Sequence, residues 1–204
     1  MFVKVCGITL REDAEAAVEL GATALGFNFY RKSQRYADPA ELDWVADLPS
    51  HIWKVGVFVN EDLATIRRLV AELKLDVVQL HGDEQPSDCP RDLRVWKAIR
   101  VDYAFDASRV KKYPAEAILL DGPAGRAYGG TGLTFDWTVA AGLPVKVVVS
   151  GGLHAGNVAE AVRVMGAGGV DVSSGVERTP GHKDPEMIRA FIRAARATEE
   201  LMVR

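Results

Sequence analysis

Eight short apolar runs, separated by segments with helical spacing, are the feature that most limits how this chain can fold. Most of these runs are continuously apolar, which is typical of parallel strands that are covered on both faces. Repeated alternation of strand and helix predicts a closed barrel in which each parallel strand is followed by a helix. The expected strands are residues 3–6, 24–28, 55–59, 77–80, 95–99, 117–121, 145–149 and 170–172.

The segments between the runs carry apolar residues three and four positions apart, which is the spacing of one helix face. Proline directly follows Asp38 and Asp184, and this pairing marks a helix start because Asp caps well and Pro fits the first helical position. Thr9 and Glu12 have the spacing of a capping box and predict another start. The predicted buried stripes are Leu63, Ile66, Val70 and Leu73; Val158, Ala161, Val162 and Met165; and Ile188, Phe191, Ile192 and Ala195.

No linker, low-complexity tract or shift in composition divides the chain, so one domain over residues 1–204 is expected. Segments 86–92 and 104–112 allow only short helices, because proline or mixed sequence interrupts them. The predicted fold is therefore α/β, a single (β/α)8 TIM barrel. An open doubly wound sheet is the alternative, but it would place a GxGxxG loop after the first strand, and the sequence has none there.

Composition and charge exclude several classes of protein. Lys and Arg number 25 against 28 Asp and Glu, a net charge of −3, so nothing attracts the whole chain to nucleic acid or to an anionic membrane. No run approaches the about 20 apolar residues of a membrane span, and residues 1–20 are too charged for a signal peptide. Cys6 and Cys89 form no CxxC pair or disulfide framework, which favours the cytoplasm. We expect a small-molecule partner and a monomer or homodimer.

In a barrel of this kind, functional side chains gather where the strands end and the next loops begin. The first strand ends at Cys6, directly before the expected helix start, whose free N–H groups favour a thiolate. An inert buried cysteine is the alternative interpretation. Asp121 closes an apolar run, where desolvation and a nearby phosphate favour a protonated carboxyl able to act as an acid. A helix cap or salt-bridge partner is the alternative there.

The turns after the seventh and eighth expected strands are rich in glycine and serine. Gly151 and Gly152 offer bare backbone N–H groups, and Ser173 and Ser174 add hydroxyls. Phosphate in such barrels is commonly held after these two strands, so we predict a phosphate site built from N–H donors. The alternative is a pair of tight turns that merely need glycine.

Two further side chains and one loop lie at strand ends. Arg35 follows the second strand and is a candidate fork for a carboxylate, or else an ordinary surface arginine. His81 has no second ligand at metal spacing, so we expect no metal and interpret it as a structural histidine or a minor substrate contact. The glycine-rich segment 122–133 is expected to be a mobile loop over the ligand. Cys89 has no nearby base and no expected chemical role.

Short motifs recur from one end of the chain to the other. They are KVCGIT at 4–9, KSQRY at 32–36, GVFVN at 56–60, VQLHG at 78–82, LLD at 119–121, YGGTG at 128–132, SGGL at 150–153 and DVSSGVE at 171–177. Each is modestly specific, but in this order they are jointly very specific. Along essentially its whole length the chain resembles the phosphoribosylanthranilate isomerase family of tryptophan biosynthesis.

The resemblance implies an Amadori rearrangement that needs no cofactor. N-(5-phosphoribosyl)anthranilate opens its sugar ring and becomes 1-(2-carboxyphenylamino)-1-deoxyribulose 5-phosphate. The resemblance further implies that Cys6 is the general base, Asp121 the general acid and Arg35 the partner of the anthranilate carboxylate. We predict the remaining substrate contacts at Gln79, His81, Gly130, Gly151, Gly152, Asp171, Ser173 and Ser174.

Two other functions stay open on the sequence. A sister barrel acting on a similar phosphorylated substrate is one of them. An indole-glycerol-phosphate synthase needs a lysine at a strand end, whereas Lys54 precedes a strand and Lys97 lies inside one. A histidine-pathway sugar isomerase has an aspartate where Cys6 stands. The second open function is that of a non-catalytic phosphosugar-binding barrel, which would be expected to lose the acid or the base.

Overall fold

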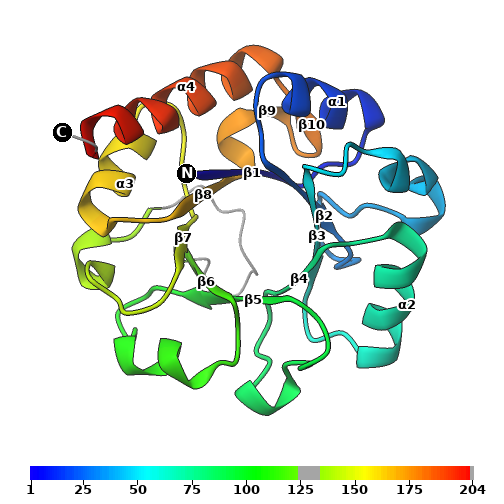
Figure 1. Ribbon diagram of the computed structural model, residues 1–204, viewed down its shortest axis with the longest axis horizontal. Helices are drawn as coiled ribbons and strands as arrows, with labels where there is room; N and C mark the ends of the chain where they lie inside the picture. The colour runs from blue at the N-terminus through cyan, green and yellow to red at the C-terminus, as the bar shows by residue number, and fades with distance from the viewer. Residues whose placement is uncertain (124–133, 203–204) are drawn as a thin grey trace.

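Eight parallel strands close into a barrel in the order β1 to β8, with β8 paired to β1 (Figure 1). The structure, a computed structural model, describes residues 1–123 and 134–202. This closed topology confirms the predicted fold class. The strands are β1 (Phe2–Cys6), β2 (Ala24–Asn28), β3 (Trp53–Phe58), β4 (Val77–Leu80), β5 (Val95–Arg100), β6 (Ala117–Asp121), β7 (Val147–Val149) and β8 (Gly169–Val172).

Each predicted strand is present, and the differences lie at the ends. β3 starts two residues earlier than expected because Trp53 already pairs with Ala24 of β2. β8 starts at Gly169, which pairs with Phe2 of β1. β7 is shorter than predicted and begins at Val147, whose partner is Ile118. Pairing with a neighbouring strand, rather than the extent of the apolar run, thus decides where each strand begins.

Helices surround the barrel as an outer ring (Figure 1). Among the described residues, three connections between barrel strands and the segment after β8 contain α-helices, and several other connections contain only 3-10 turns, including the two segments expected to be short. The α-helices are α1 (Arg11–Glu19), α2 (Leu63–Leu73), α3 (Val158–Met165) and α4 (Pro185–Met202). The 3-10 turns are η1 (Pro39–Glu41), η2 (Asp43–Asp47), η3 (Pro86–Asp88), η4 (Ala107–Lys112), η5 (Trp137–Ala140) and η6 (Ser174–Val176). No helix in these ranges is long and apolar enough to cross a membrane.

The apolar stripes of the helices pack against the outside of the barrel. In α3 and α4 all the predicted stripe residues are buried. In α2 the buried residues are Ile66, Leu69 and Leu73, whereas Leu63 and Val70 are only half-buried. The stripe in α2 is therefore turned slightly from the predicted one, and Leu69 takes the place expected for Val70.

Two of the predicted helix starts are confirmed. The carboxylate of Asp184 accepts from the backbone N–H groups of Glu186 (2.8 Å) and Met187 (3.1 Å) at the start of α4. Asp38 caps in the same way by accepting from Ala40 N–H at 3.1 Å, although only a 3-10 turn follows.

The predicted capping box at Thr9 is wrong. Helix α1 begins at Arg11 with Leu10 as its cap residue, and no side chain caps it. The Thr9 hydroxyl instead donates to the carbonyl of Gly181, at 2.6 Å. Gly181 belongs to a hairpin that the sequence did not predict, formed by β9 (Glu177–Thr179) and β10 (His182–Lys183). A long-range contact has therefore replaced a local one.

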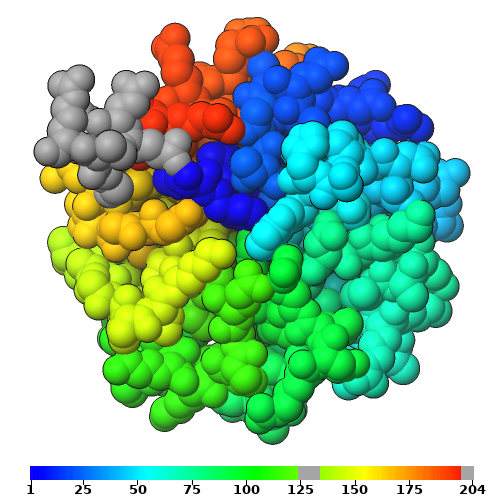
Figure 2. Space-filling model, in the orientation of Figure 1, coloured from blue at the N-terminus to red at the C-terminus, as the bar shows by residue number. Residues whose placement is uncertain are grey.

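Alternate residues of each strand point into the barrel and fill it in layers. At the amino-terminal end, the rings of Phe2, Trp53 and Trp96 pack with centroids 4.9 to 5.9 Å apart. Side chains close the middle of the ring in the space-filling view (Figure 2). Lys4 and Asp171 form the next layer, two residues along their strands from Phe2 and Gly169, and Lys4 Nζ lies 2.9 Å from the Asp171 carboxylate. Cys6 follows Lys4 on the same face of β1, so it lies at the carboxyl end.

Candidate active site

The predicted catalytic residues lie at the carboxyl ends of strands, as expected for this fold. Cys6 is the last residue of β1, and Asp121 is the last residue of β6. Gly130 lies outside the described residues. The other predicted substrate contacts lie in strands or in the loops that follow them: Arg35, Gln79, His81, Gly151, Gly152, Asp171, Ser173 and Ser174.

The backbone around Cys6 differs from the prediction. The N–H groups of Gly7 and Ile8 both donate to the carbonyl of Gly26, at 2.9 Å each. They are therefore not free to stabilise a thiolate, and α1 begins only at Arg11. The helix-start explanation for a reactive Cys6 is thus wrong, and the charge that favours a thiolate has to come from side chains.

Two buried ammonium groups supply that charge. Burial raises the pKa of the Cys6 thiol, and Asp171 adds to the rise, whereas Lys4 and Lys183 act to lower it. The residue as a whole is half-buried at the end of β1. Cys6 is therefore a thiol at rest whose ionised form already has two cations beside it.

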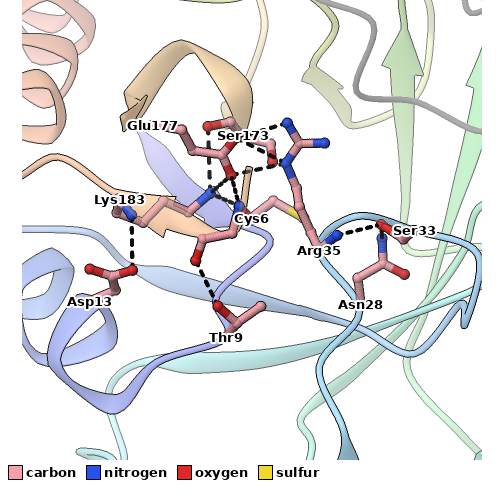
Figure 3. Close-up of polar contacts among 10 residues, drawn as sticks. Cys6, Thr9, Asp13, Asn28, Ser33, Arg35, Ser173, Glu177 and Lys183 are labelled. Carbon is pink, nitrogen blue, oxygen red and sulfur yellow. Dashed lines mark hydrogen bonds and ion pairs between the residues drawn. The ribbon is translucent and has the colours of Figure 1, made fainter. Parts of the chain in front are cut away.

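Arg35 is held by a carboxylate that the sequence did not single out (Figure 3). Its Nε donates to Glu177 at 2.9 and 3.1 Å, and its Nη2 donates to the same carboxylate at 2.7 Å. The loop that carries Arg35 is fastened by Ser33, whose hydroxyl accepts from Arg35 N–H at 3.0 Å and from Asn28 Nδ2 at 3.1 Å. This fork–fork pair fixes the guanidinium plane.

Lys183 completes the cluster from the hairpin (Figure 3). Its ammonium donates to Glu177 Oε1 at 2.7 Å and also reaches the backbone carbonyls of Cys6 and Ser173. Its backbone N–H donates to Asp13 at 2.9 Å. Burial lowers the pKa of Lys183, and Glu177 opposes that effect. The β9–β10 hairpin thus ties the end of β1, the end of β8 and Arg35 into one unit.

Asp121 is buried and is held from two sides. His81 Nε2 lies 3.1 Å from Asp121 Oδ2, and Gln79 Nε2 lies 2.9 Å from His81 Nδ1. An amide N–H₂ can only donate, so this assignment of the Gln79 amide places the histidine proton on Nε2, facing the carboxylate. Gly122 N–H donates to the other carboxylate oxygen at 3.0 Å. His81 therefore positions the predicted acid, a role that the strand-end position alone did not reveal.

A cavity of about 260 Å³ opens beside this acid, between the ends of β4, β5 and β6. It carries both cationic and apolar groups, and Asp121 forms part of its wall. Its lining includes His81, Lys97, Arg100, Phe105, Arg109 and Asp121.

Of the two turns predicted to bind phosphate, the one after β7 lies against the acid. Gly151 has φ of +79°, and a Cβ there would lie 2.1 Å from the backbone nitrogen of Gly122 and 2.9 Å from Asp121 Oδ1. Only glycine allows this approach, so the turn after β7 lies against the end of β6. After β8, the Ser173 hydroxyl is buried and has no hydrogen-bond partner within the described part of the chain. An unpartnered buried donor in a turn of this kind is available for a ligand oxygen.

Gln79 and Asp171 lie one layer deeper than the other predicted contacts. Gln79 is fully buried and its amide nitrogen meets His81. Asp171 is buried between Lys4 Nζ at 2.9 Å and the Ser150 hydroxyl at 3.4 Å. Both therefore contact other site residues directly, and a substrate contact by either stays a prediction.

Three residues of the site were missed from the sequence: Lys4, Glu177 and Lys183. Lys4 did leave a signal, because a lysine inside an apolar strand two positions before Cys6 must share its inward face. Such a buried charge also needs a partner, which Asp171 on the adjoining strand supplies. Glu177 and Lys183 left none, since nothing in the sequence predicts the hairpin that brings them to Arg35.

Other candidate groups take structural roles. The ammonium of Lys97 donates to the carbonyls of Leu80 (3.2 Å) and Gly82 (2.7 Å) and to Glu84 (2.8 Å), so its three protons are used. Cys89 is buried, and burial raises the pKa of its thiol. No group of three or more His, Cys, Asp or Glu side chains suited to a metal ion occurs in the part of the chain that the structure describes.

Comparison with known proteins gives a consistent result. The family model described as N-(5'phosphoribosyl)anthranilate (PRA) isomerase matches residues 3–194. A protein of that name from Solibacter usitatus is 49% identical over 197 residues, covering 97% of this chain and 98% of that protein. The crystal structure of phosphoribosyl anthranilate isomerase from Thermotoga maritima superposes with a TM-score of 0.87 at 40% identity, covering 97% of this chain and 99% of that one.

A second similar structure, of a phosphoribosyl anthranilate isomerase, contains a ligand. It is a complex with reduced 1-(o-carboxyphenylamino)-1-deoxyribulose 5-phosphate, with a TM-score of 0.85, 40% identity, and coverage of 97% of this chain and 99% of that one. A third, at the same identity and TM-score, holds engineered monomers of the dimeric Thermotoga enzyme. The matches extend over nearly the whole of both partners in each case. The chain therefore belongs to the N-(5'-phosphoribosyl)anthranilate isomerase family.

Proposed function

We propose that this chain isomerises N-(5'-phosphoribosyl)anthranilate by general acid–base catalysis, with Cys6 as the base and Asp121 as the acid. The isomerisation itself is a step of tryptophan biosynthesis and is the activity of the family. The observation that carries the mechanism is the pairing of one half-buried cysteine with one buried aspartate at the carboxyl end of the same barrel.

The chemistry moves two protons. Asp121 delivers one to the furanose ring oxygen, so the C1'–O bond breaks and an iminium forms at C1'. The Cys6 thiolate takes the other from C2', and the electrons of that C–H bond form the enolamine. Tautomerisation of the enolamine then gives the ketose. Each transfer by a positioned side chain is worth about 10²–10⁴ in rate.

The rest of the site holds the substrate between these two groups. N–H groups of the turns after β7 and β8 bind the phosphate, and Arg35 binds the anthranilate carboxylate. Arg35 already shares its Nε and Nη2 with Glu177, so the substrate carboxylate meets the remaining edge of the guanidinium. The partner is thus a small phosphorylated molecule, with no nucleic acid or membrane involved.

We also infer a cytoplasmic setting and a monomer or homodimer. Both cysteines are free thiols, which suits a reducing compartment. The dimeric enzyme from Thermotoga maritima gives a precedent for the homodimer.

A crystal structure with the reduced product analogue tests the proposed function. We expect its phosphate within hydrogen-bond reach of N–H groups from Gly151–Gly152 and Ser173–Ser174. We also expect C2' to face the sulfur of Cys6 and O4' to face Asp121. A phosphate at the amino-terminal end of the barrel, near Phe2, would refute the proposed orientation.

Substitution of Arg35 tests the carboxylate contact. Arg35→Ala should raise KM strongly and lower kcat less, because the guanidinium mainly binds and orients the substrate. Arg35→Lys should recover only part of the loss, since an ammonium cannot form a bidentate fork. Arg68→Ala, on the exposed face of α2, is the matched control and should leave both constants unchanged. An unchanged KM in Arg35→Ala would assign this residue to the Glu177 cluster alone.

A further inference from the structure

Lys4 is a buried cation that the proposed mechanism does not yet use. Its side chain has no exposed surface, because it points into the barrel from the middle of β1. In the pairing of β1 with β8, Lys4 stands directly opposite Asp171, and its Nζ lies 2.9 Å from Asp171 Oδ1. The side chain of Asp171 is buried as well, with 5% of its surface exposed. The barrel therefore holds a complete ion pair inside its apolar interior.

The same ammonium reaches the thiol of Cys6. Lys4 and Cys6 are two positions apart on β1, so both side chains point to the inward face. Both lie over Gly26 of β2: a Cβ there would be 2.7 Å from the Cys6 sulfur and 3.0 Å from Lys4 Nζ. Gly26 leaves the space in which the two groups meet, and each group shifts the pKa of the other.

We propose that Lys4 is a positioning residue for the base, and that its ammonium, anchored by Asp171, is the counter-charge that stabilises the Cys6 thiolate. This inference rests on the proposed role of Cys6. A charge appears on the sulfur when the thiol ionises and disappears when the sulfur takes the C2' proton. A fixed ammonium stabilises the charged form without moving, because the ion pair below it is already assembled.

The charges around the sulfur support this assignment. Lys4 on the same strand and Lys183 on the hairpin act to lower the pKa of the thiol, whereas burial and Asp171 on β8 act to raise it. Burial also acts to lower the pKa of Lys4, yet Asp171 and Cys6 outweigh it, and the pKa of Lys4 is raised. Lys4 therefore stays charged. Lys183 is shared with Glu177 and two carbonyls, which leaves Lys4 as the better placed counter-charge.

A purely structural role for this pair is the competing explanation. Buried ion pairs are weak contributors to stability, and replacing both partners by neutral groups is often neutral or stabilising. Removal of one partner alone strands the other charge and is costly. A double substitution therefore separates the two explanations, because it removes the ammonium and its carboxylate together.

The test measures the thiol directly. In a Cys89→Ser background, Cys6 is the one remaining cysteine of the two in the chain. The rate of alkylation by iodoacetamide as a function of pH then reports its ionisation. We expect Lys4→Met to slow alkylation at neutral pH by at least about tenfold, equivalent to a rise of about one unit in the thiol pKa. The rate at high pH, where the thiol is fully ionised, should not change, which controls for access.

The variant Lys4→Met/Asp171→Asn completes the test. It should fold with the parent's stability. The pKa of the Cys6 thiol should rise as in Lys4→Met, but by less. The value of kcat should fall while KM changes little. A folded Lys4→Met variant with the alkylation profile of the Cys89→Ser parent, or a double variant with the profile of Asp171→Asn alone, would overturn the role of Lys4. This readout does not depend on turnover. An active Cys6→Ser enzyme would therefore refute Cys6 as the base without affecting the measured link between Lys4 and the thiol.

Discussion

Replacement of Cys6 by serine should lower kcat about 10²–10⁴-fold, equivalent to about 3 to 5 kcal/mol of activation free energy. A serine hydroxyl is nearly isosteric with the thiol, so the barrel should fold and bind the product analogue as before. A hydroxyl ionises far less readily than a thiol, however, and the cations beside it cannot make up that difference. Steady-state kinetics with N-(5'-phosphoribosyl)anthranilate and the thermal unfolding midpoint measure the two outcomes.

Cys89→Ser is the matched control for this substitution. Cys89 is buried under the turn after β4, and its sulfur contacts only the carbonyl of Gln85, at 3.9 Å, among the hydrogen bonds of the described residues. It should therefore leave kcat and KM unchanged. Turnover near the parent value in Cys6→Ser would remove the thiolate base from the mechanism.

The sequence predicted the barrel because its evidence is local and repeated. Apolar runs such as residues 77–80 and 117–121 fall on observed strands, β4 and β6, with the same bounds. Once the strands are known, the fold itself places their last residues at one rim, so Cys6 and Asp121 could be identified without any contact being known. The site could be predicted to this extent because position along a strand decides which side chains reach the rim.

The contacts between loops could not be predicted in this way. Thr9 has the spacing of a helix cap, but its hydroxyl bonds to Gly181, which is 172 positions away in the chain. Glu177 and Lys183 reach Arg35 and Cys6 only because a short hairpin folds back across the rim. Local spacing carries no information about such pairings. Local spacing therefore predicts a helix start as the source of positive charge beside Cys6, whereas the structure shows that two lysines supply it.

The acid shows how the two kinds of information combine. Asp121 was found from its position at the end of a buried run, and its burial is confirmed. Its hydrogen-bond partners could not be predicted: His81 lies just after β4, and Gly122 donates its backbone N–H to the second carboxylate oxygen. These partners hold the carboxylate at one orientation. A general acid needs such fixed geometry, because a proton is transferred only over hydrogen-bond distance.

Asp121→Asn is expected to lower kcat about 10²–10⁴-fold, because an amide cannot deliver a proton to the ring oxygen. The amide oxygen can still accept from His81 Nε2 or from Gly122 N–H, so the fold and the binding of the product analogue should be retained. Asp92→Asn makes the same chemical change in an exposed pair with Arg67 and should leave the kinetics unchanged. If Asp121→Asn turned over at the parent rate, the ring oxygen would have to receive its proton from elsewhere. The carboxylate would then serve only to orient His81.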